Sequence, residues 1–459
     1  MISDSEYRLE APSRVEERLR FYLILAALAA FNLWHSHAMG LCHDEAYYWV
    51  YSRFLAWGYF DHPPMVAAAI AMGHSLIAGA LGVRLLFIAM ELGAIVLMWR
   101  MTDRRDALLF WAIVLSLPLL QVGGTLALPD MPLIFFATLF LTIVRRYIES
   151  DGLFPALALA VSAALMLYSK YHGILVIGLT LAAAPGLVRR KSFWIAAGLT
   201  VLLLVPHIVW QVRNDFISVR FQLSRAPDWM NTGLILEYIV GQVGSAGLFS
   251  GLILLYVLIF KFRPANTFER VLKLNSAGIL AFFLVMSLKG KVEANWTQVA
   301  FIPLALIAHS YLQHTRRLRK WTMRLALIPI VLVFAVRLIF VFPPENSRAL
   351  RRAYEFHDWP EITLKVTRYA GDMPVVARTY PHAASLSFYS GSIVPAINLG
   401  SRDNQFTLWK LERGILDTEV CYVSGSRIPG AYMIETRQGD KLYLIRGMTI
   451  PEIRQRFGR

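Results

Sequence analysis

The stretch from Leu41 to Met65, LCHDEAYYWVYSRFLAWGYFDHPPM, gathers reactive side chains between two long apolar runs. It holds an acidic pair, Asp44 and Glu45, and an acid–histidine pair, Asp61 and His62, separated by an aromatic segment. Carboxylates can act as bases on an attacking hydroxyl group. We interpret the stretch as the floor of an active site at the water–lipid boundary, with the aromatic segment forming a helix along the membrane surface.

More polar residues stand at the ends of later apolar runs, on the side of the membrane predicted to be outside. They are Asp130, Lys170, Tyr171, His172, Arg213, Lys289, Lys291 and Asn295. Ionisable groups at membrane depth are costly and are usually functional. Lysine and arginine bind phosphate well. Acids and cations together therefore suit a phosphate-bearing lipid substrate.

Structural explanations for several of these residues stay open at the level of sequence. The pair Asp44–Glu45 is also what the dipole favours at a helix N-terminus, and Asp130 could cap a helix. Lys170 could extend its ammonium group toward the interface. His62, which precedes two prolines, could belong to a rigid turn.

Composition sets the class of protein. Of the 459 residues, 56% are hydrophobic and 17% are charged, whereas soluble domains have about 45–50% apolar and about 25% charged residues. This deviation predicts a membrane protein with many spans, because surfaces that face lipid need apolar side chains. The net charge of +15 lies mostly in short loops, where Lys and Arg fix orientation. We therefore expect a bilayer and no nucleic acid as partner.

The first part of the chain predicts its orientation. Residues 1–20 end in arginines and form a cytoplasmic segment, amphipathic or disordered, and Phe21–Met39 is an uncleaved first span. Residues 40–64 are then the first outer loop. The run Pro63–Leu81 is expected not to cross fully, because Val83–Met101 follows at once and ends in an arginine cluster typical of the inner side.

The remaining runs alternate across the membrane. They are Ala107–Val122, Met131–Val144, Leu153–Ser169, Gly173–Val188, Phe193–Val212, Leu234–Phe260, Val271–Leu288, Trp296–Leu312 and Trp321–Phe342. We therefore predict an all-α membrane domain over residues 21–342, with about 11–13 transmembrane helices, about eleven of them complete spans.

The composition changes at Pro343. Residues 343–459 are polar, with short β-type runs at 374–378, 420–423 and 441–445, and predict a small α/β domain on the outer face. Cys42 and Cys421 would share that compartment, so a disulfide between them is open.

Five motifs in order carry a resemblance to a known family. They are HDEAYYW, GYFDHPPMVA, LPDMPLIFF, YSKYHGILV and GKVEANW, followed in the tail by ARTYPHAASLSFYSG and QFTLW. The chain resembles bacterial GT-C membrane glycosyltransferases of the dolichyl-phosphate-mannose–protein mannosyltransferase-like family. That family includes aminoarabinose and galacturonosyl transferases that act on lipid A and lipopolysaccharide core.

The resemblance implies a GT-C fold and an enzyme that uses a polyprenyl-phosphate-linked sugar. It would transfer the sugar, with inversion, to a lipid or glycolipid acceptor, lipid A or lipopolysaccharide core, at the outer face of the bacterial inner membrane. The C-terminal domain would be periplasmic. The alternatives are a protein O-glycosyl or polysaccharide-modifying transferase of the same fold, or a transporter of lipid-linked sugars. A transporter is less favoured, since the polar residues gather at one face.

The resemblance also implies roles for individual residues. Asp44 matches the essential acid of the first loop, Glu45 follows it, and Asp130 matches a second acidic position, so these three are the expected catalytic residues. No cofactor is required; a divalent metal ion, if one is used, would take oxygen ligands from the same three carboxylates.

The remaining roles concern donor and acceptor. Lys170 matches a lysine near the donor phosphate, and the further phosphate-binding candidates are Arg213, Lys289 and Lys291. Tyr59, Asp61 and His62 stand where aminoarabinose transferases carry an aromatic residue, an acid and a lysine. Histidine in place of lysine favours the galacturonosyl branch. The other expected substrate contacts are Tyr171, His172 and Asn295.

Overall fold

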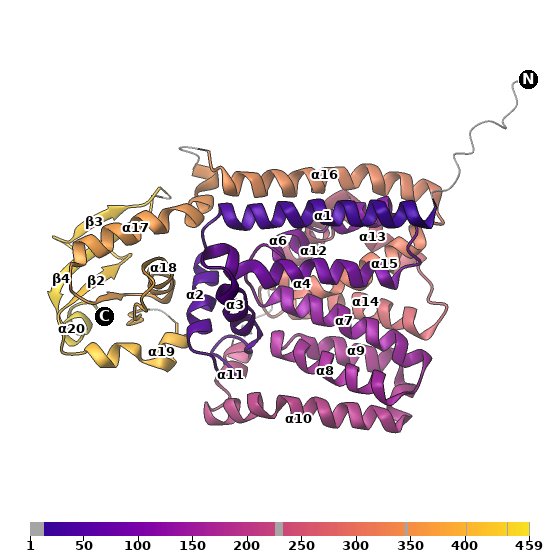
Figure 1. Cartoon of the computed structure of the whole chain (residues 1–459), viewed down its shortest axis with the longest axis horizontal. Coiled ribbons are helices and arrows are strands. Elements are labelled where there is room, and N and C mark those ends of the chain that lie inside the picture. Colours follow the sequence, from indigo (N-terminus) through magenta and orange to yellow (C-terminus); the bar gives the residue numbers. More distant parts are fainter. Residues whose placement is uncertain (1–12, 225–232, 345–347, 401, 438, 459) are drawn as a thin grey trace, which may run out of the picture.

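The computed structural model describes residues 13–224, 233–344, 348–400, 402–437 and 439–458. Roughly parallel helices form a bundle, and a small α/β domain built from the C-terminal residues sits against one end of it (Figure 1). Residues 1–12 of the predicted cytoplasmic segment lie outside the described part. Arg14 already begins α1 (Arg14–Ala38), after a capping box formed by Ser13 and Glu16.

Six described helices are long and apolar enough to cross a membrane. They are α1 (Arg14–Ala38), α4 (Gly79–Met101), α7 (Asp130–Glu149), α10 (Lys191–Arg213), α14 (Thr267–Ser287) and α16 (Arg316–Val341). A seventh span results if α12 (Gly233–Ser245) and the segment Leu248–Lys261, which bends away by 99°, count as one. That segment comprises α13 (Leu248–Tyr256) and the π-helical turn η2 (Val257–Lys261). The chain is thus a multi-pass membrane protein.

By length and composition, six or seven described helices qualify as spans, against about eleven expected from the apolar runs. The other apolar runs form shorter helices: α5 (Ala107–Leu115), α6 (Pro118–Gly123), α8 (Leu153–Ser169), α9 (Gly173–Ala183), η1 (Pro185–Arg189), η3 (Ala294–Ala300) and α15 (Phe301–Leu312). Much of α5 and α15 is buried inside the bundle. Short apolar helices are tolerated there because neighbouring protein satisfies the backbone groups freed at a break. Hydropathy alone does not separate them from lipid-facing spans.

The predicted partial element at residues 63–81 has a simple geometry. Helix α3 (Met65–Leu76) has 12 residues, which corresponds to about 18 Å against a hydrocarbon core of about 30 Å. It is therefore too short to cross, as the sequence predicts. It packs closely on α4, where a Cβ added to Gly73 would collide with the Gly82 carbonyl oxygen.

The aromatic segment of the first loop forms a helix, as predicted: α2 (His43–Arg53), which runs across the end of the bundle (Figure 1). Every residue from Glu45 to Tyr51 is buried. The helix packs between α3 and α18 (Tyr380–Ser390), where the bundle meets the C-terminal domain (Figure 1). Its aromatic side chains therefore form an internal joint between the two parts.

The C-terminal domain is a four-stranded mixed sheet with helices. The strands β1 (Val375–Ala377), β2 (Val420–Ser424), β3 (Tyr432–Glu435) and β4 (Lys441–Met448) lie in the order β1-β2-β4-β3. β1 and β2 are parallel, with Val376 opposite Tyr422, and the other pairs are antiparallel. The helical elements are η4 (Arg348–Tyr354), α17 (Glu355–Ala370), α18, α19 (Gln405–Trp409), η5 (Leu411–Ile415) and α20 (Ile450–Phe457).

The α/β prediction for this domain is confirmed, and its three β-type runs are β1, β2 and β4. Strand β3 was not predicted, although it lies in a short apolar run, Ala431 to Ile434; three of its four residues are exposed. Cys42 and Cys421 are both free thiols, and the disulfide left open by the sequence is not formed.

A fully buried arginine joins several of these elements. Arg84 of α4 donates from Nε and Nη2 to the two carboxylate oxygens of Glu45, each at 2.6 Å. Its remaining N–H groups donate to the carbonyl oxygens of Ser36, Met39 and Gly40 at the end of α1. All five guanidinium donors are thereby used.

Glu45 is equally well satisfied. Besides Arg84, its carboxylate accepts from the backbone N–H of Cys42 at 3.2 Å and from that of Ala127 at 2.9 Å. The pair therefore ties the end of α1, the start of α2, α4 and the segment before α7 into one unit.

We expect Glu45→Gln to destabilise the protein by about 3–5 kcal/mol, because it leaves the Arg84 charge buried without its counter-ion. The double variant Glu45→Gln/Arg84→Met should lose less than the sum of the two single variants. Thermal unfolding in detergent measures both. The control Glu361→Gln removes an exposed carboxylate and should stay within about 0.5 kcal/mol. Equal losses in Glu45→Gln and the control would contradict the assignment.

Candidate active site

A cavity of about 740 Å³ opens at the end of the bundle that meets the C-terminal domain. Most of the site residues predicted from the sequence line it: Asp44, Asp61, His62, Asp130, Lys170, Tyr171, His172, Lys289, Lys291 and Asn295. They come from helix ends and the segments between helices, where the backbone leaves the bundle. Charged groups are least costly at such positions, because they lie near water.

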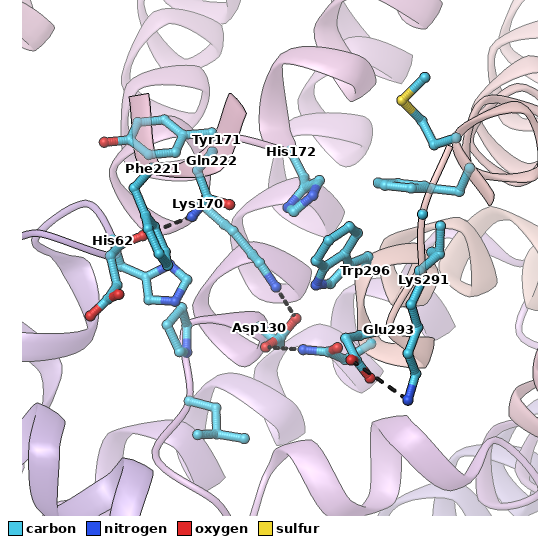
Figure 2. A pocket seen from close by; sticks show the side chains of 18 of the residues that line it. His62, Asp130, Lys170, Tyr171, His172, Phe221, Gln222, Lys291, Glu293 and Trp296 are labelled. Carbon is cyan, nitrogen blue, oxygen red and sulfur yellow. Dashed lines mark hydrogen bonds and ion pairs between the residues drawn. The ribbon is translucent and has the colours of Figure 1, made fainter. Parts of the chain in front are cut away.

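One wall of the cavity is built around Asp130 and Lys170. Asp130 is the first residue of α7, and its Oδ1 accepts from Lys170 Nζ at 2.7 Å. Its Oδ2 accepts from Asn295 Nδ2 at 3.0 Å. Figure 2 shows Lys170 extending between His62 and Trp296 to reach Asp130. Both charges are buried, so Lys170 does not extend to the interface. The carboxylate of Asp130 binds Lys170 and Asn295 and does not cap the helix.

Another part of the wall is built around Asp61, which accepts three hydrogen bonds. Tyr47 and Tyr51 of α2 donate to Oδ2, each at 2.9 Å, and Arg402 Nη1 donates to Oδ1 at 2.9 Å. Arg402 comes from the C-terminal domain. Its guanidinium lies 4.9 Å from the ring centre of Phe221, so its position is fixed from two sides. The domain thus supplies part of the cavity.

Asp44 differs from these two acids. Solvent reaches its side chain through the cavity, and within the described residues no hydrogen bond or ion pair engages its carboxylate. Desolvation by the surrounding protein, and then the nearby carboxylate of Glu355, raise the pKa of Asp44 above its ordinary value. It is a carboxylate at the start of a rigid helix that remains available to a substrate.

The cavity also has an apolar side. His172 packs against Phe283 and Trp296, with ring centres 5.3 and 5.8 Å away. Ile174 and Phe282 line the cavity and are 58% and 41% exposed. The space therefore continues to the outer surface of α9 and α14, a geometry that can accept a lipid chain alongside a polar head.

The structure places three predicted site residues outside the cavity. Glu45 is fully buried and bound to Arg84, so it has no free oxygen for catalysis. Tyr59 is buried, stacks on Tyr51 at 4.2 Å, and donates to backbone carbonyls. Arg213 ends α10 as an exposed residue. The cavity therefore brings together the other predicted site residues but not Glu45, Tyr59 or Arg213.

Other residues of the site were missed. Tyr47, Tyr48, Phe221, Trp296, Tyr380 and Arg402 line the cavity. Trp296 stands inside the motif GKVEANW, and Arg402 stands three residues before the motif QFTLW, so adjacent motifs were a usable signal. Arg84, which holds Glu45, was signalled by its place inside an apolar run, where a charge needs a partner.

The three carboxylates considered for a metal ion do not form a common site. Glu45 is bound to Arg84, and Asp130 is bound to Lys170. Across the described ranges, no group of three or more His, Cys, Asp or Glu side chains is placed to hold a metal ion.

Fold and cavity together define a class: a multi-pass membrane protein with a polar chamber between its helical bundle and a small α/β domain. ArnT from Cupriavidus metallidurans has this fold. Its apo structure superposes with a TM-score of 0.66 at 15% identity, covering 92% of this chain and 97% of ArnT. Its complex with undecaprenyl phosphate gives a TM-score of 0.64 at 16% identity, with the same coverage.

The relationship is also visible in the sequence. Residues 61–210 match the family described as dolichyl-phosphate-mannose-protein mannosyltransferase. The chain is 24% identical over 305 residues to the lipid A galacturonosyltransferase RgtD of Rhizobium johnstonii, which covers 62% of this chain and 64% of that relative's length. These comparisons confirm the family resemblance and the GT-C fold.

We expect Arg402→Gln to loosen the contact between the C-terminal domain and the bundle, because Asp61 loses its cation. Amide hydrogen exchange around residues 47–61 and 402–409 should accelerate about fivefold, for a half-exposed pair worth about 1 kcal/mol. Arg413→Gln, an exposed arginine outside the cavity, is the matched control. Unchanged exchange in Arg402→Gln would show that this ion pair does not hold the domain.

Proposed function

We propose that this chain is an inverting glycosyltransferase. It takes a sugar from a polyprenyl phosphate and transfers it to an acceptor at the outer face of the bacterial inner membrane, either lipid A or lipopolysaccharide core. The observation that carries the proposal is the cavity itself. It combines one available carboxylate, Asp44, with a wall of lysines and with an apolar side open to lipid.

The relatives support each part of this proposal. The match to a mannosyltransferase family supports sugar transfer. The ArnT complex contains undecaprenyl phosphate, a polyprenyl phosphate like the donor's carrier. RgtD, a lipid A galacturonosyltransferase, supports a lipid A acceptor and a uronic acid sugar. His62, in place of the lysine expected of aminoarabinose transferases, favours the same branch.

The donor would lie along the apolar side. Its prenyl chain follows Ile174 and Phe282 toward the lipid, and its phosphate meets the ammonium groups of Lys170, Lys289 and Lys291. Lys170 uses one N–H on Asp130 and keeps two for phosphate oxygens. Because Asp130, itself bound by Asn295, fixes the Lys170 ammonium, the phosphate binds without further ordering of that side chain.

The transfer step involves one new bond and one broken bond. The acceptor hydroxyl oxygen attacks the anomeric carbon on the face opposite the phosphate, and the bond from that carbon to the phosphate oxygen breaks. The electron pair leaves on the phosphate, where the lysines stabilise the charge. Asp44 takes the hydroxyl proton. An acceptor phosphate would bring no such proton, and Asp44 would then only orient it.

The orientation follows from charge. The helix ends opposite the cavity carry most of the basic residues, among them Arg100, Arg104, Arg145, Arg189, Lys261 and Arg316. That end is therefore assigned to the cytoplasm with the start of α1, and the cavity and the C-terminal domain are assigned to the periplasm.

We expect deletion of the gene to remove one sugar mass from lipid A or core oligosaccharide, measured by mass spectrometry of lipopolysaccharide. Asp44→Asn should reproduce the loss at normal protein level, because the amide cannot accept the proton. Asp372→Asn, the same change at an exposed residue of the outer domain, should restore the sugar. An unchanged profile in the deletion strain would exclude these acceptors and direct attention to protein or polysaccharide.

The pH dependence tests the role of Asp44. The pKa of Asp44 is raised. As the pH is lowered, the rate should therefore begin to fall at a higher pH than it would with an ordinary aspartate, whose pKa is about 3.9. Glu355→Gln removes a negative neighbour, lowers the pKa of Asp44, and should shift this acidic limb to lower pH. Asp372→Asn should not move it. A limb unaffected by Glu355→Gln would mean that Asp44 is not the base.

A further inference from the structure

A second cavity, of about 610 Å³, lies on the other side of α2 from the site described above. Asp44, Tyr47 and Tyr48 of that helix line the first cavity, whereas Trp49 and Arg53 line the second. The end of α1, the turn between α3 and α4 and the end of α18 complete its wall. The proposed transferase reaction makes no use of it.

The charge of this cavity is of one sign. Among the described residues that line it, Arg53 carries a full positive charge, His37 and His74 are the histidines, and none is an aspartate or glutamate. The first cavity, by contrast, balances its lysines and arginine with acids. A concave surface with this charge favours an anion.

Arg53 is held in place by aromatic contact. Its guanidinium lies 5.8 Å from the ring centre of Trp49, which in turn packs edge-on against Phe388 at 5.2 Å. Trp49 is 5% exposed, and within the described residues its indole N–H has no acceptor. A buried donor without a partner costs stability. Trp49 itself lines the cavity, so its ring offers an aromatic surface beside the Arg53 guanidinium.

The surroundings of the cavity are apolar and face outward. Leu33 lies one turn before His37 on α1 and is 40% exposed, and Leu76 and Ile77 beside the α3–α4 turn are 68% and 41% exposed. In a multi-pass membrane protein such side chains contact acyl chains. A cationic, aromatic pocket beside an acyl-facing surface at a helix end matches an amphiphile with a phosphorylated head.

We propose that this second cavity binds the phosphate-bearing headgroup of an anionic membrane lipid, with Arg53 and Trp49 as its main contacts. The acyl chains lie along Leu33, Leu76 and Ile77. The bound lipid contacts the same helix that carries Asp44 and braces the joint between bundle and domain. This site shares no lining residue with the cavity that contains Asp44, and it does not depend on the proposed reaction.

The test is native mass spectrometry of the full-length protein in a neutral detergent, titrated with phosphatidylglycerol or phosphatidylcholine. We expect preferential binding of phosphatidylglycerol, weakened about fivefold by Arg53→Gln, for one cation near a lipid phosphate. Arg53→Lys should retain most of the affinity. Arg213→Gln is the control, because it removes an exposed arginine of α10 that does not line this cavity.

Three outcomes would overturn the proposal. Equal phosphatidylglycerol binding by Arg53→Gln and Arg213→Gln would remove Arg53 from the site. Equal binding of the two lipids would remove the preference for an anion. Binding of soluble glycerol phosphate as strong as that of phosphatidylglycerol would identify a free phosphate ester instead of a lipid. Asp44→Asn should bind phosphatidylglycerol normally, which separates this site from the transferase cavity.

Discussion

The buried ion pair between Arg84 and Glu45 is the constraint on which the architecture of the site depends. Two charges taken out of water are costly, and their attraction offsets that cost only when every remaining donor and acceptor is satisfied. In this protein the carbonyl groups at the end of α1 accept the remaining N–H groups of Arg84, and the backbone N–H groups of Cys42 and Ala127 donate to Glu45. The requirement to satisfy the pair therefore fixes where α2 starts.

That position determines what the neighbouring residues can do. Glu45 points into the protein, and Asp44, one residue earlier at the first turn of α2, reaches the cavity. On later turns, Tyr47 and Tyr51 hold Asp61 through their hydroxyl groups. One short helix thus presents an available acid, positions a second acid, and is anchored by a third. Of the two adjacent acids, Glu45 is structural and Asp44 faces the cavity.

The sequence predicts the residues of the site more accurately than it predicts the helices around them. Polar residues at the ends of apolar runs stand out because the bilayer penalises charge, so Asp130, Lys170 and Asn295 could be found without coordinates. Their hydrogen bonds to one another could not, since they depend on how α7, α8 and η3 pack. Fewer described helices than apolar runs are long enough to span, because several runs fold into short or broken helices, and a buried helix such as α15 is as apolar as one that faces lipid. Arg402 was missed because its partner, Asp61, lies 341 residues away.

Arg402 extends from the C-terminal domain to an acid of the bundle, so the two parts of the chain cannot be exchanged independently. Asp61 belongs to the bundle, yet its counter-ion belongs to the C-terminal domain. A hybrid built by joining this bundle to the outer domain of a relative would leave the acid without its cation unless the incoming domain supplies one at the same place. One hydrophobic cluster also runs through both parts, with Tyr47 on one side of residue 343 and Phe406 on the other, so the two parts can be exchanged only together.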